Sequence, residues 1–126
     1  MLIDNITLLP NSVIIGEKDE KTLNVAGTLT LMTGTARWYP TQNIQLISVQ
    51  SHVNTPPVGA NILISIKKNG VVIISGVSII PSTNSSSIVS DSTLATIGDY
   101  LTVDITQIGS STPGSDLTVQ ILYKAT

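Results

Sequence analysis

The chain has 126 residues, the size of one domain with a single hydrophobic core. Hydrophobic residues make up 41% and charged residues 11%, and a formal net charge of −2 excludes the basic surface that nucleic acid or anionic lipid requires. The sequence has no cysteine, which excludes disulfides and thiolate metal ligands, and its apolar runs are far shorter than the ~20 residues of a membrane helix.

The first 21 residues form a separate region in our division of the chain, and residues 22–126 form the expected domain. Apolar residues crowd the first region, Pro10 interrupts them, and five charged residues at 17–21 follow. Two interpretations are open: a first strand followed by a solvated loop, or an N-terminal arm that packs on a neighbouring subunit. The candidate interface residues of this arm are Leu2, Ile3, Ile6, Leu8, Val13, Ile14 and Ile15.

From residue 22 onward, apolar side chains recur at every second position, as they do in half-buried strands. Val, Ile and Thr dominate, and their β-branched side chains suit a pleated sheet. Ala26-Gly27 marks an expected bulge, and a change of phase falls near Ile47. The predicted strands are 22–32, 43–53, 60–68, 71–80, 86–92, 100–108 and 116–124.

These strands are separated by breaks rich in Pro, Gly and Asn, which predict turns. Seven or eight strands at this spacing indicate an antiparallel β-sandwich. We favour a jelly roll over an immunoglobulin-like sandwich. Because no segment keeps a helical apolar stripe for three turns, the chain is assigned to the all-β class.

An Asn-Gly pair at 69–70 predicts a two-residue β-hairpin, because both residues tolerate positive φ. Pairing across this turn places Ile66 opposite Ile73. The second strand of the hairpin is expected to be apolar on both faces, with Val72 and Ile74 on the side away from Ile73. A strand that is apolar on both faces has a partner over its outer face as a rule, so Val72 and Ile74 are candidate contact residues.

Side chains for catalysis or metal binding are scarce. His52 is the only histidine, and we expect it at the surface or in a hydrogen bond rather than as a catalytic base. A glycosidase pair could be drawn from four aspartates, but turn capping and surface pairing explain each of them. These aspartates are Asp91, Asp99, Asp104 and Asp116. The sequence contains no Gly-x-Ser-x-Gly elbow, phosphate loop or EF-hand, so we expect no enzyme activity, metal or cofactor.

One local cluster combines residue types that anchor interfaces. Arg37, Trp38 and Tyr39 are adjacent, and they include the only Arg and the only Trp of the chain. Such residues could recognise a sugar or a peptide by stacking. The alternative is structural: Trp38 fills the core, and Tyr39 closes one end of the sandwich.

Four segments carry a resemblance to known proteins: GTARWYP at 34–40, KKNG at 67–70, GDYLTVD at 98–104 and PGSDLTV at 113–119. In this order they are similar to a β-sandwich module of tailed-bacteriophage virion proteins, including those of cyanophages. The resemblance covers roughly residues 27–123 and consists of turns and strand starts. It implies a structural component of the virion and transfers no binding residue.

Two virion roles follow from the resemblance. The favoured role is a capsid decoration (cement) protein that binds the outside of the head as a homotrimer, with the major capsid protein as its partner. The alternative is a tail-fibre or baseplate module that binds a host glycan receptor. The short stretch before the expected sandwich favours decoration, so we expect the chain at the capsid surface of a virion made in the host cytoplasm. No nucleic acid, membrane or small-molecule ligand is expected as a partner.

Overall fold

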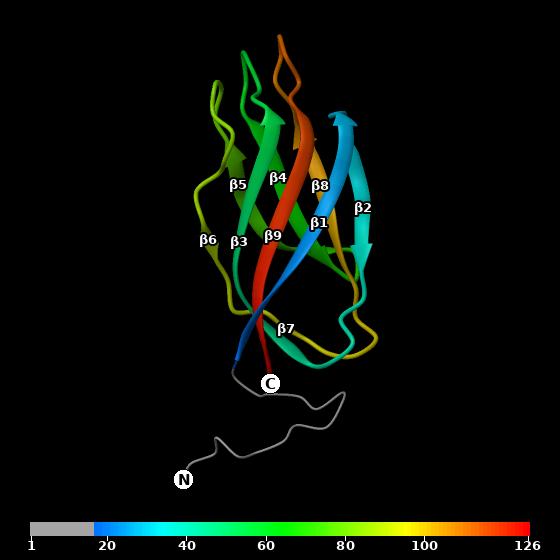
Figure 1. Ribbon diagram of the computed structural model, residues 1–126. Coiled ribbons are helices and arrows are strands. Elements are labelled where there is room, and N and C mark those ends of the chain that lie inside the picture. Colours follow the sequence, from blue (N-terminus) through cyan, green and yellow to red (C-terminus); the bar gives the residue numbers. More distant parts are fainter. Residues whose placement is uncertain (1–16) are drawn as a thin grey trace.

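The computed structural model describes residues 17–126. Within this range the chain forms nine strands and no helix, in two antiparallel sheets that pack face to face (Figure 1). The predicted all-β sandwich is therefore confirmed, and the preference for a jelly roll over an immunoglobulin-like sandwich stays a prediction. The strands are β1 (Lys18–Thr28), β2 (Met32–Trp38), β3 (Ile44–Thr55), β4 (Ile62–Lys68), β5 (Val71–Ile79), β6 (Val89–Ser90), β7 (Leu94–Ala95), β8 (Leu101–Gln107) and β9 (Ser115–Ala125).

The N-terminal region is only partly within the described range. All seven candidate arm residues precede Glu17 and so lie outside the described residues. The charged residues that follow them open β1, where Lys18 pairs with Lys124 and Lys21 pairs with Ile121. The first strand of the sandwich therefore starts at Lys18 rather than at residue 22. In the described part of the chain, we find no helix that could cross a membrane.

The lateral order of the strands determines which of them are sheet edges. The first sheet has the order β1-β9-β3, and the short strands β6 and β7 pair with different parts of β3. The second sheet has the order β2-β8-β4-β5. β1 contacts β2 across the sandwich, and β3 contacts β5. Consequently β1 and β2 lie at one lateral side of the molecule, and β5 lies at the other.

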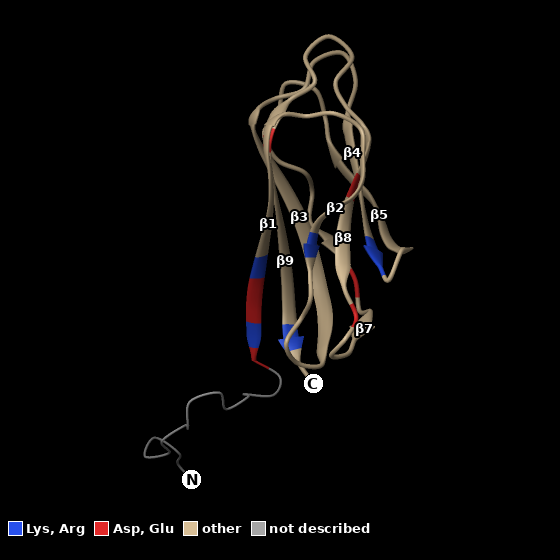
Figure 2. Cartoon of the chain, turned by 90° about the vertical axis from the view of Figure 1, so that its right-hand side faces the viewer, with Lys and Arg blue, Asp and Glu red and all other residues tan. Residues whose placement is uncertain are grey.

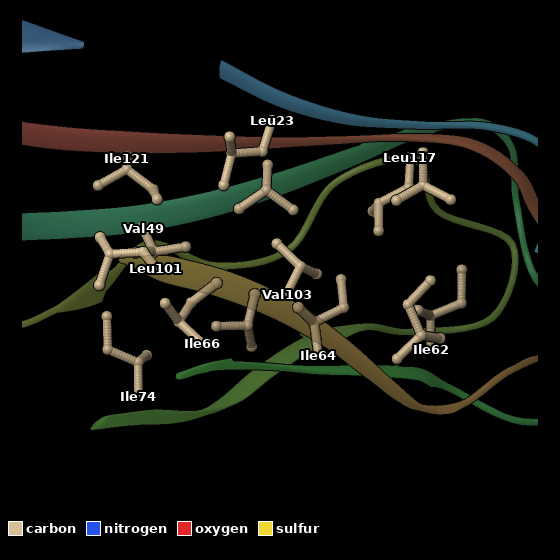
Figure 3. Packing of buried hydrophobic residues seen from close by; sticks show 14 of the residues in the cluster. Leu23, Val49, Ile62, Ile64, Ile66, Ile74, Leu101, Val103, Leu117 and Ile121 are labelled. Atoms are coloured by element: carbon tan, nitrogen blue, oxygen red, sulfur yellow. The ribbon is translucent and has the colours of Figure 1, made fainter. Parts of the chain in front are cut away.

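Inward-facing side chains of both sheets form one aliphatic core (Figure 3). Ile64, Ile66 and Val103 come from the second sheet, and Leu117 and Ile121 come from β9 of the first sheet. Each of these five side chains is at most 1% exposed. Burial of a side chain of this size contributes about 1.5–3 kcal/mol to folding. The period-two pattern in the sequence is thus the alternation between this core and solvent.

Both irregularities predicted from the sequence are present. The register of β1 against β9 shifts between Val25 and Thr28, where Gly27 has a φ of 83°. The register of β3 against β9 shifts between Leu46 and Ser48. Each shift moves the following side chains to the opposite face, which restores the inward direction of the next apolar residue.

β2 is a strand that the alternation does not predict. The strand expected at 22–32 ends at Thr28, and a turn leads directly into β2. Its register against β8 shifts twice, between Met32 and Thr35 and again between Thr35 and Trp38. Two bulges in seven residues remove the period of two, so the sequence pattern hides this strand. The strand expected at 86–92 is shorter than predicted, because within these residues only β6 (Val89–Ser90) forms.

The hairpin at Asn69-Gly70 is confirmed, but its register differs from the prediction. Both turn residues have positive φ, 52° and 84°, as a type I′ turn requires. One register shift, between Lys67 and Ile66, places Ile74 rather than Ile73 opposite Ile66, and a second shift follows between Ile66 and Ile64. Ile74 consequently points into the core and is 3% exposed, so its assignment as a contact residue is wrong. Val72 is 50% exposed and keeps the outward position that was predicted for it.

The two ends of the sandwich differ in charge. We call the end formed by loops 56–61, 80–88 and 108–114 the apex, and the opposite end, where β1 begins and β9 ends, the base (Figure 1). The apex loops contain no charged residue. All six Lys and Arg of the chain lie in the half of the sandwich nearer the base (Figure 2). They are Lys18, Lys21, Arg37, Lys67, Lys68 and Lys124.

Candidate functional site

His52 lies on the outer face of the first sheet and contacts two polar side chains. Its Nδ1 is 2.7 Å from Oγ of Ser85, and its Nε2 is 2.7 Å from Oε1 of Gln120. Because the amide oxygen only accepts, Nε2 donates to it, and Nδ1 is hydrogen-bonded to the serine hydroxyl. The expected hydrogen-bonded histidine is therefore confirmed. A neutral amide cannot offset the charge of an imidazolium as an aspartate does, so this trio favours a cross-strand structural contact.

Each of the four aspartates considered for a carboxylate pair accepts a hydrogen bond from a backbone amide at 2.8–3.0 Å. The donors are the amides of Thr93 for Asp91, Thr96 for Asp99, Gly34 for Asp104 and Gly27 for Asp116. These carboxylates hold turns and bulges, which is the ordinary role of aspartate at such positions. Among residues 17–126, no group of three His, Asp or Glu side chains could hold a metal ion.

Asp104 is buried, although the sequence pattern places it on an exposed polar face. It is 5% exposed, its Oδ1 accepts the Gly34 amide at 2.8 Å, and its Oδ2 lies 2.8 Å from Nζ of Lys67. The first bulge of β2 stands opposite Asp104 between the pairs Met32–Ile105 and Thr35–Val103. The bulge covers the carboxylate, and the carboxylate satisfies the amide that the bulge leaves without a strand partner.

The structure separates Trp38 from the other two members of the predicted recognition cluster, Arg37 and Tyr39, which stay together. Trp38 is half-buried, packs against the core, and lies 5.3 Å from the ring of Tyr123. The Nζ of Lys21 is 5.9 Å from the Trp38 ring. This position agrees with the structural interpretation of Trp38, which closes the core near the base.

Arg37, Tyr39 and Tyr100 form a group that we call the Arg37 cluster, in which Arg37 and Tyr39 are exposed and Tyr100 is half-buried. The guanidinium carbon of Arg37 lies 4.2 Å from the centre of the Tyr100 ring, a cation–π distance. Nη1 of Arg37 donates to the hydroxyl of Tyr39 at 3.2 Å, and the two tyrosine rings are 5.6 Å apart. The hydrogen bond to Tyr39 raises the pKa of Arg37 above its ordinary value. The cluster therefore presents a fixed positive charge between two aromatic rings.

The turn before Tyr100 holds this residue in place. Asn69 donates from its side chain to Oδ1 of Asp99 at 2.8 Å and accepts the backbone amide of Tyr100 at 3.1 Å. The backbone amide of Thr96 and the Asn69 side chain both donate to Asp99, and these bonds hold the pKa of this carboxyl below its ordinary value. The β4–β5 hairpin turn thereby fixes the loop that carries Tyr100.

The three apex loops are joined by backbone hydrogen bonds. Val58 donates to the carbonyl of Thr112 at 2.9 Å, and Ser111 donates to the carbonyl of Val58 at 2.9 Å. Ser82 donates to the carbonyl of Pro57 at 2.9 Å. These bonds link loops that are far apart in sequence, so the apex is a preformed surface rather than three independent loops.

The apex and the adjoining turn after β1 expose several large aliphatic side chains, and three of them lie apart from Ile88, which lines the outer face of the first sheet. These three are Leu31, Val58 and Ile80, which are 64%, 43% and 55% exposed. The turn is linked to the apex because the Leu29 amide donates to the carbonyl of Gly114. We call Leu31, Val58 and Ile80 the apex surface. Apolar side chains on an uncharged, preformed surface suit contact with another protein.

A shallow hollow lies on the outer face of the first sheet, and its volume is about 180 Å³. Its lining residues are Glu20, Ser48, Gln50, Ile88, Gln120 and Leu122. Small-molecule sites are generally larger, about 300–1,000 Å³, and bring several polar groups together. This hollow contains one carboxylate and no second charged group, so it offers no arrangement for acid–base chemistry.

Sequence reasoning missed Tyr100 and the apex surface. Tyr100 lies 61 positions after Tyr39 in the numbering, and only the closure of the second sheet brings the two rings together. The apex residues lie in three turns that the sequence marks only as breaks between strands. The absence of charge from these turns was the available signal. No protein-family model matches this chain, and no curated protein matches its sequence.

Proposed function

We propose that this chain is a non-enzymatic structural protein of a tailed-phage virion, a decoration protein that binds the outside of the head as a homotrimer. Its partner is the major capsid protein, and its binding stabilises the shell. The observation that carries the proposal is the apex surface, where three exposed aliphatic side chains stand among loops without charge. The resemblance of segments 34–40, 67–70, 98–104 and 113–119 to virion β-sandwich modules supplies the virion context.

The chemistry of the apex suits a protein partner. Its loops contain no basic residue to contact a phosphate and no aromatic residue to stack on a sugar ring. Because backbone hydrogen bonds join the loops before any partner binds, little conformational entropy is lost on docking. Three copies related by a three-fold axis engage together, so weak apex contacts add to a tight attachment.

The proposal is tested by binding to purified heads of the source phage from which bound copies have been removed. Leu31→Asp, Val58→Asp and Ile80→Asp each place a charge on the apex surface, and each is expected to weaken binding at least tenfold, which corresponds to about 1.4 kcal/mol. The matched control is Ile97→Asp, at a residue near the base that is 67% exposed. This variant should bind as the unaltered chain does.

Two results would contradict the proposal. If the unaltered chain does not bind heads, the decoration role is wrong. If Ile97→Asp abolishes binding and the three apex variants bind normally, the base rather than the apex contacts the capsid.

The Arg37 cluster supports a second candidate function, a tail-fibre or baseplate module that binds a host glycan. Two tyrosine rings and a guanidinium on one exposed surface could stack on a sugar and pair with its acidic group. Glycan-array binding by the unaltered chain, lost in Arg37→Ala and Tyr39→Ala but kept in Leu31→Asp, would favour this role. Head binding without glycan binding would exclude it.

A further inference from the structure

Exposed sheet edges invite pairing with further strands, and proteins protect them with charges, bulges or short strands. β1 begins with four charged residues, Lys18 to Lys21. β2 has two bulges, and β6 and β7 have two residues each. The sheet edges at β1, β2 and β6/β7 are therefore protected in recognised ways.

Among the edge strands longer than two residues in the described chain, β5 is the one without a charged residue or a proline. It runs for nine residues from Val71 to Ile79, and within the described chain it pairs with β4 alone. Val71 and Val72 are 66% and 50% exposed. Although two bulges bend its first part, residues 77–79 pair regularly with residues 62–64 of β4. The free edge of residues 77–79 consequently offers regularly spaced backbone groups, and the exposed Val71 and Val72 lie at the hairpin end of the same strand, before the bulges.

We propose that β5 accepts residues 2–9 of a neighbouring copy as an added strand. The inference rests on the homotrimer of the proposed function, and it specifies the contact that joins neighbouring protomers. This segment consists of LIDNITLL and has Asp4 as its single charged residue. Its leucines and isoleucines suit an edge that exposes valines, and Pro10 ends the strand because proline cannot donate to a ladder.

The lateral order of the strands explains why the donor is a neighbour. β1 begins at one side of the sandwich, whereas β5 is the edge on the other side. In a single chain the segment would have to pass the base loops 39–43 and 91–100 (Figure 1). In the homotrimer of the proposed function, the β1 side of one protomer faces the β5 side of the next, and the three-fold rotation closes this head-to-tail contact into a ring. The chain between residue 9 and Lys18 spans at most about 30 Å, enough to reach an adjacent edge.

The absence of cysteine from the natural sequence allows a direct test by disulfide formation. Full-length chains with Ile6→Cys or Leu8→Cys are mixed with chains that carry Val72→Cys or Ser75→Cys, and the mixture is oxidised. We expect covalent pairs that join one chain of each kind. Leu31→Cys, at an exposed residue of the apex surface, is the matched acceptor and should give no such pair.

A chain that carries both Leu8→Cys and Ser75→Cys tests the intramolecular alternative. If disulfides form within this chain and the mixtures give none, the donor is the same chain and our proposal is wrong. If no acceptor in β5 reacts better than Leu31→Cys, the β5 edge is not the site and the proposal is equally wrong.

Hydrogen exchange gives a second readout that does not depend on register. In the full-length Ile6→Lys/Leu8→Lys variant, amides of residues 71–79 should exchange at least tenfold faster than in the unaltered chain, while amides of β9 stay protected. Unchanged exchange in β5 would overturn the inference. Since head binding is measured separately with the apex variants, failure of the decoration role leaves these results interpretable.

Discussion

Ser51 is a buried polar residue without a side-chain partner. It lies in β3, is 0% exposed, and its Oγ has no hydrogen-bond partner among the described residues. Its backbone amide donates to Oγ of Ser86, which in turn donates to the carbonyl of Ser87. The two serines thus differ, since one hydroxyl is orphaned in the core and the other bridges two backbone groups.

Substitution of the two serines is expected to have opposite effects. Ser51→Ala removes an unsatisfied hydroxyl and should raise the free energy of unfolding by about 1 kcal/mol. Ser86→Ala removes the acceptor of the Ser51 amide and should lower it by about 1–2 kcal/mol. Urea denaturation followed by circular dichroism measures both changes. A loss of stability in Ser51→Ala would show that its hydroxyl has a partner.

Asp99 lies in the turn that holds Tyr100 of the Arg37 cluster, and its contribution to the stability of the folded chain depends on pH. Hydrogen bonds from Thr96 and Asn69 lower its pKa in the folded chain from the ordinary value of 3.8. The unfolded chain therefore binds a proton first as pH falls, and the stability that Asp99 contributes is complete above its unfolded pKa and is lost as pH falls through its folded pKa. Asp99→Asn should lack this contribution. The stability difference between the two chains should be constant between pH 5 and 7 and shrink below pH 3.8, as measured by denaturation at each pH. A difference independent of pH would contradict this role.

The attachment of the edge strand β2 to its sheet depends on the ion pair between Asp104 and Lys67. Asp104 binds both the bulge amide of Gly34 and Nζ of Lys67, so it joins the edge strand β2 to β4 across β8. Asp104→Ala leaves Lys67 unpaired and the Gly34 amide without an acceptor. We expect a loss of about 2–4 kcal/mol in the free energy of unfolding. The matched variant Asp116→Ala, which removes a carboxylate from the exposed bulge of β1, should cost less. Equal losses would show that β2 is held by its strand pairing alone.

Gly70 and Gly109 resist substitution for different reasons. The first has a backbone conformation that favours glycine, and the second has a neighbouring atom where a Cβ would lie. Gly70 has a φ of 84° in the hairpin turn, and a Cβ there would meet no atom, so Gly70→Ala should cost about 1 kcal/mol through backbone strain. A Cβ on Gly109 would collide with the carbonyl of Thr112 in the apex. Gly109→Ala should therefore cost at least about 2–3 kcal/mol and weaken head binding, because the apex backbone must move. Thermal melting and head binding of the two variants measure the contrast, and a smaller effect at Gly109 would contradict it.

The elements could be predicted where a single periodicity governs them. Ile64 and Ile66 alternate with polar residues because every second side chain of β4 points into the core, and this pattern is visible without any structure. The pattern fails at β2, where two bulges interrupt it, and at β5, where one extra residue before Ile74 turns this side chain inward. The Arg37 cluster could be predicted only in part. Arg37 and Tyr39 are neighbours in sequence, but Tyr100 joins them through the pairing of β2 with β8, a contact that local patterns do not encode.

At the scale of the whole molecule, charge and apolar surface are distributed unevenly. The basic residues gather toward the base (Figure 2), while the apex is uncharged. Nine large hydrophobic side chains of the described region are at least 43% exposed, in a chain of which only 11% is charged. A monomer would leave this surface in water, whereas the association that we propose would bury part of it. The apex surface and the β5 edge lie on different parts of the molecule, so the proposed capsid binding and the proposed oligomer use separate surfaces.

This separation predicts how stability depends on protein concentration. Association stabilises the folded chain by mass action, so Tm should rise as the concentration of the unaltered protein increases from 1 to 100 µM, a range chosen to span weak association at about micromolar Kd. For a domain of this size, each kcal/mol of stabilisation shifts Tm by about 4 °C, so a rise of several degrees is expected. The Ile6→Lys/Leu8→Lys variant should lose this dependence, whereas Val58→Asp should keep it, because we assign the apex to capsid binding and not to the oligomer. Scanning calorimetry at three concentrations, with light scattering for the molar mass, measures both. A Tm that is independent of concentration, together with the mass of a single chain, would refute the oligomer and leave the exposed β5 edge without an occupant.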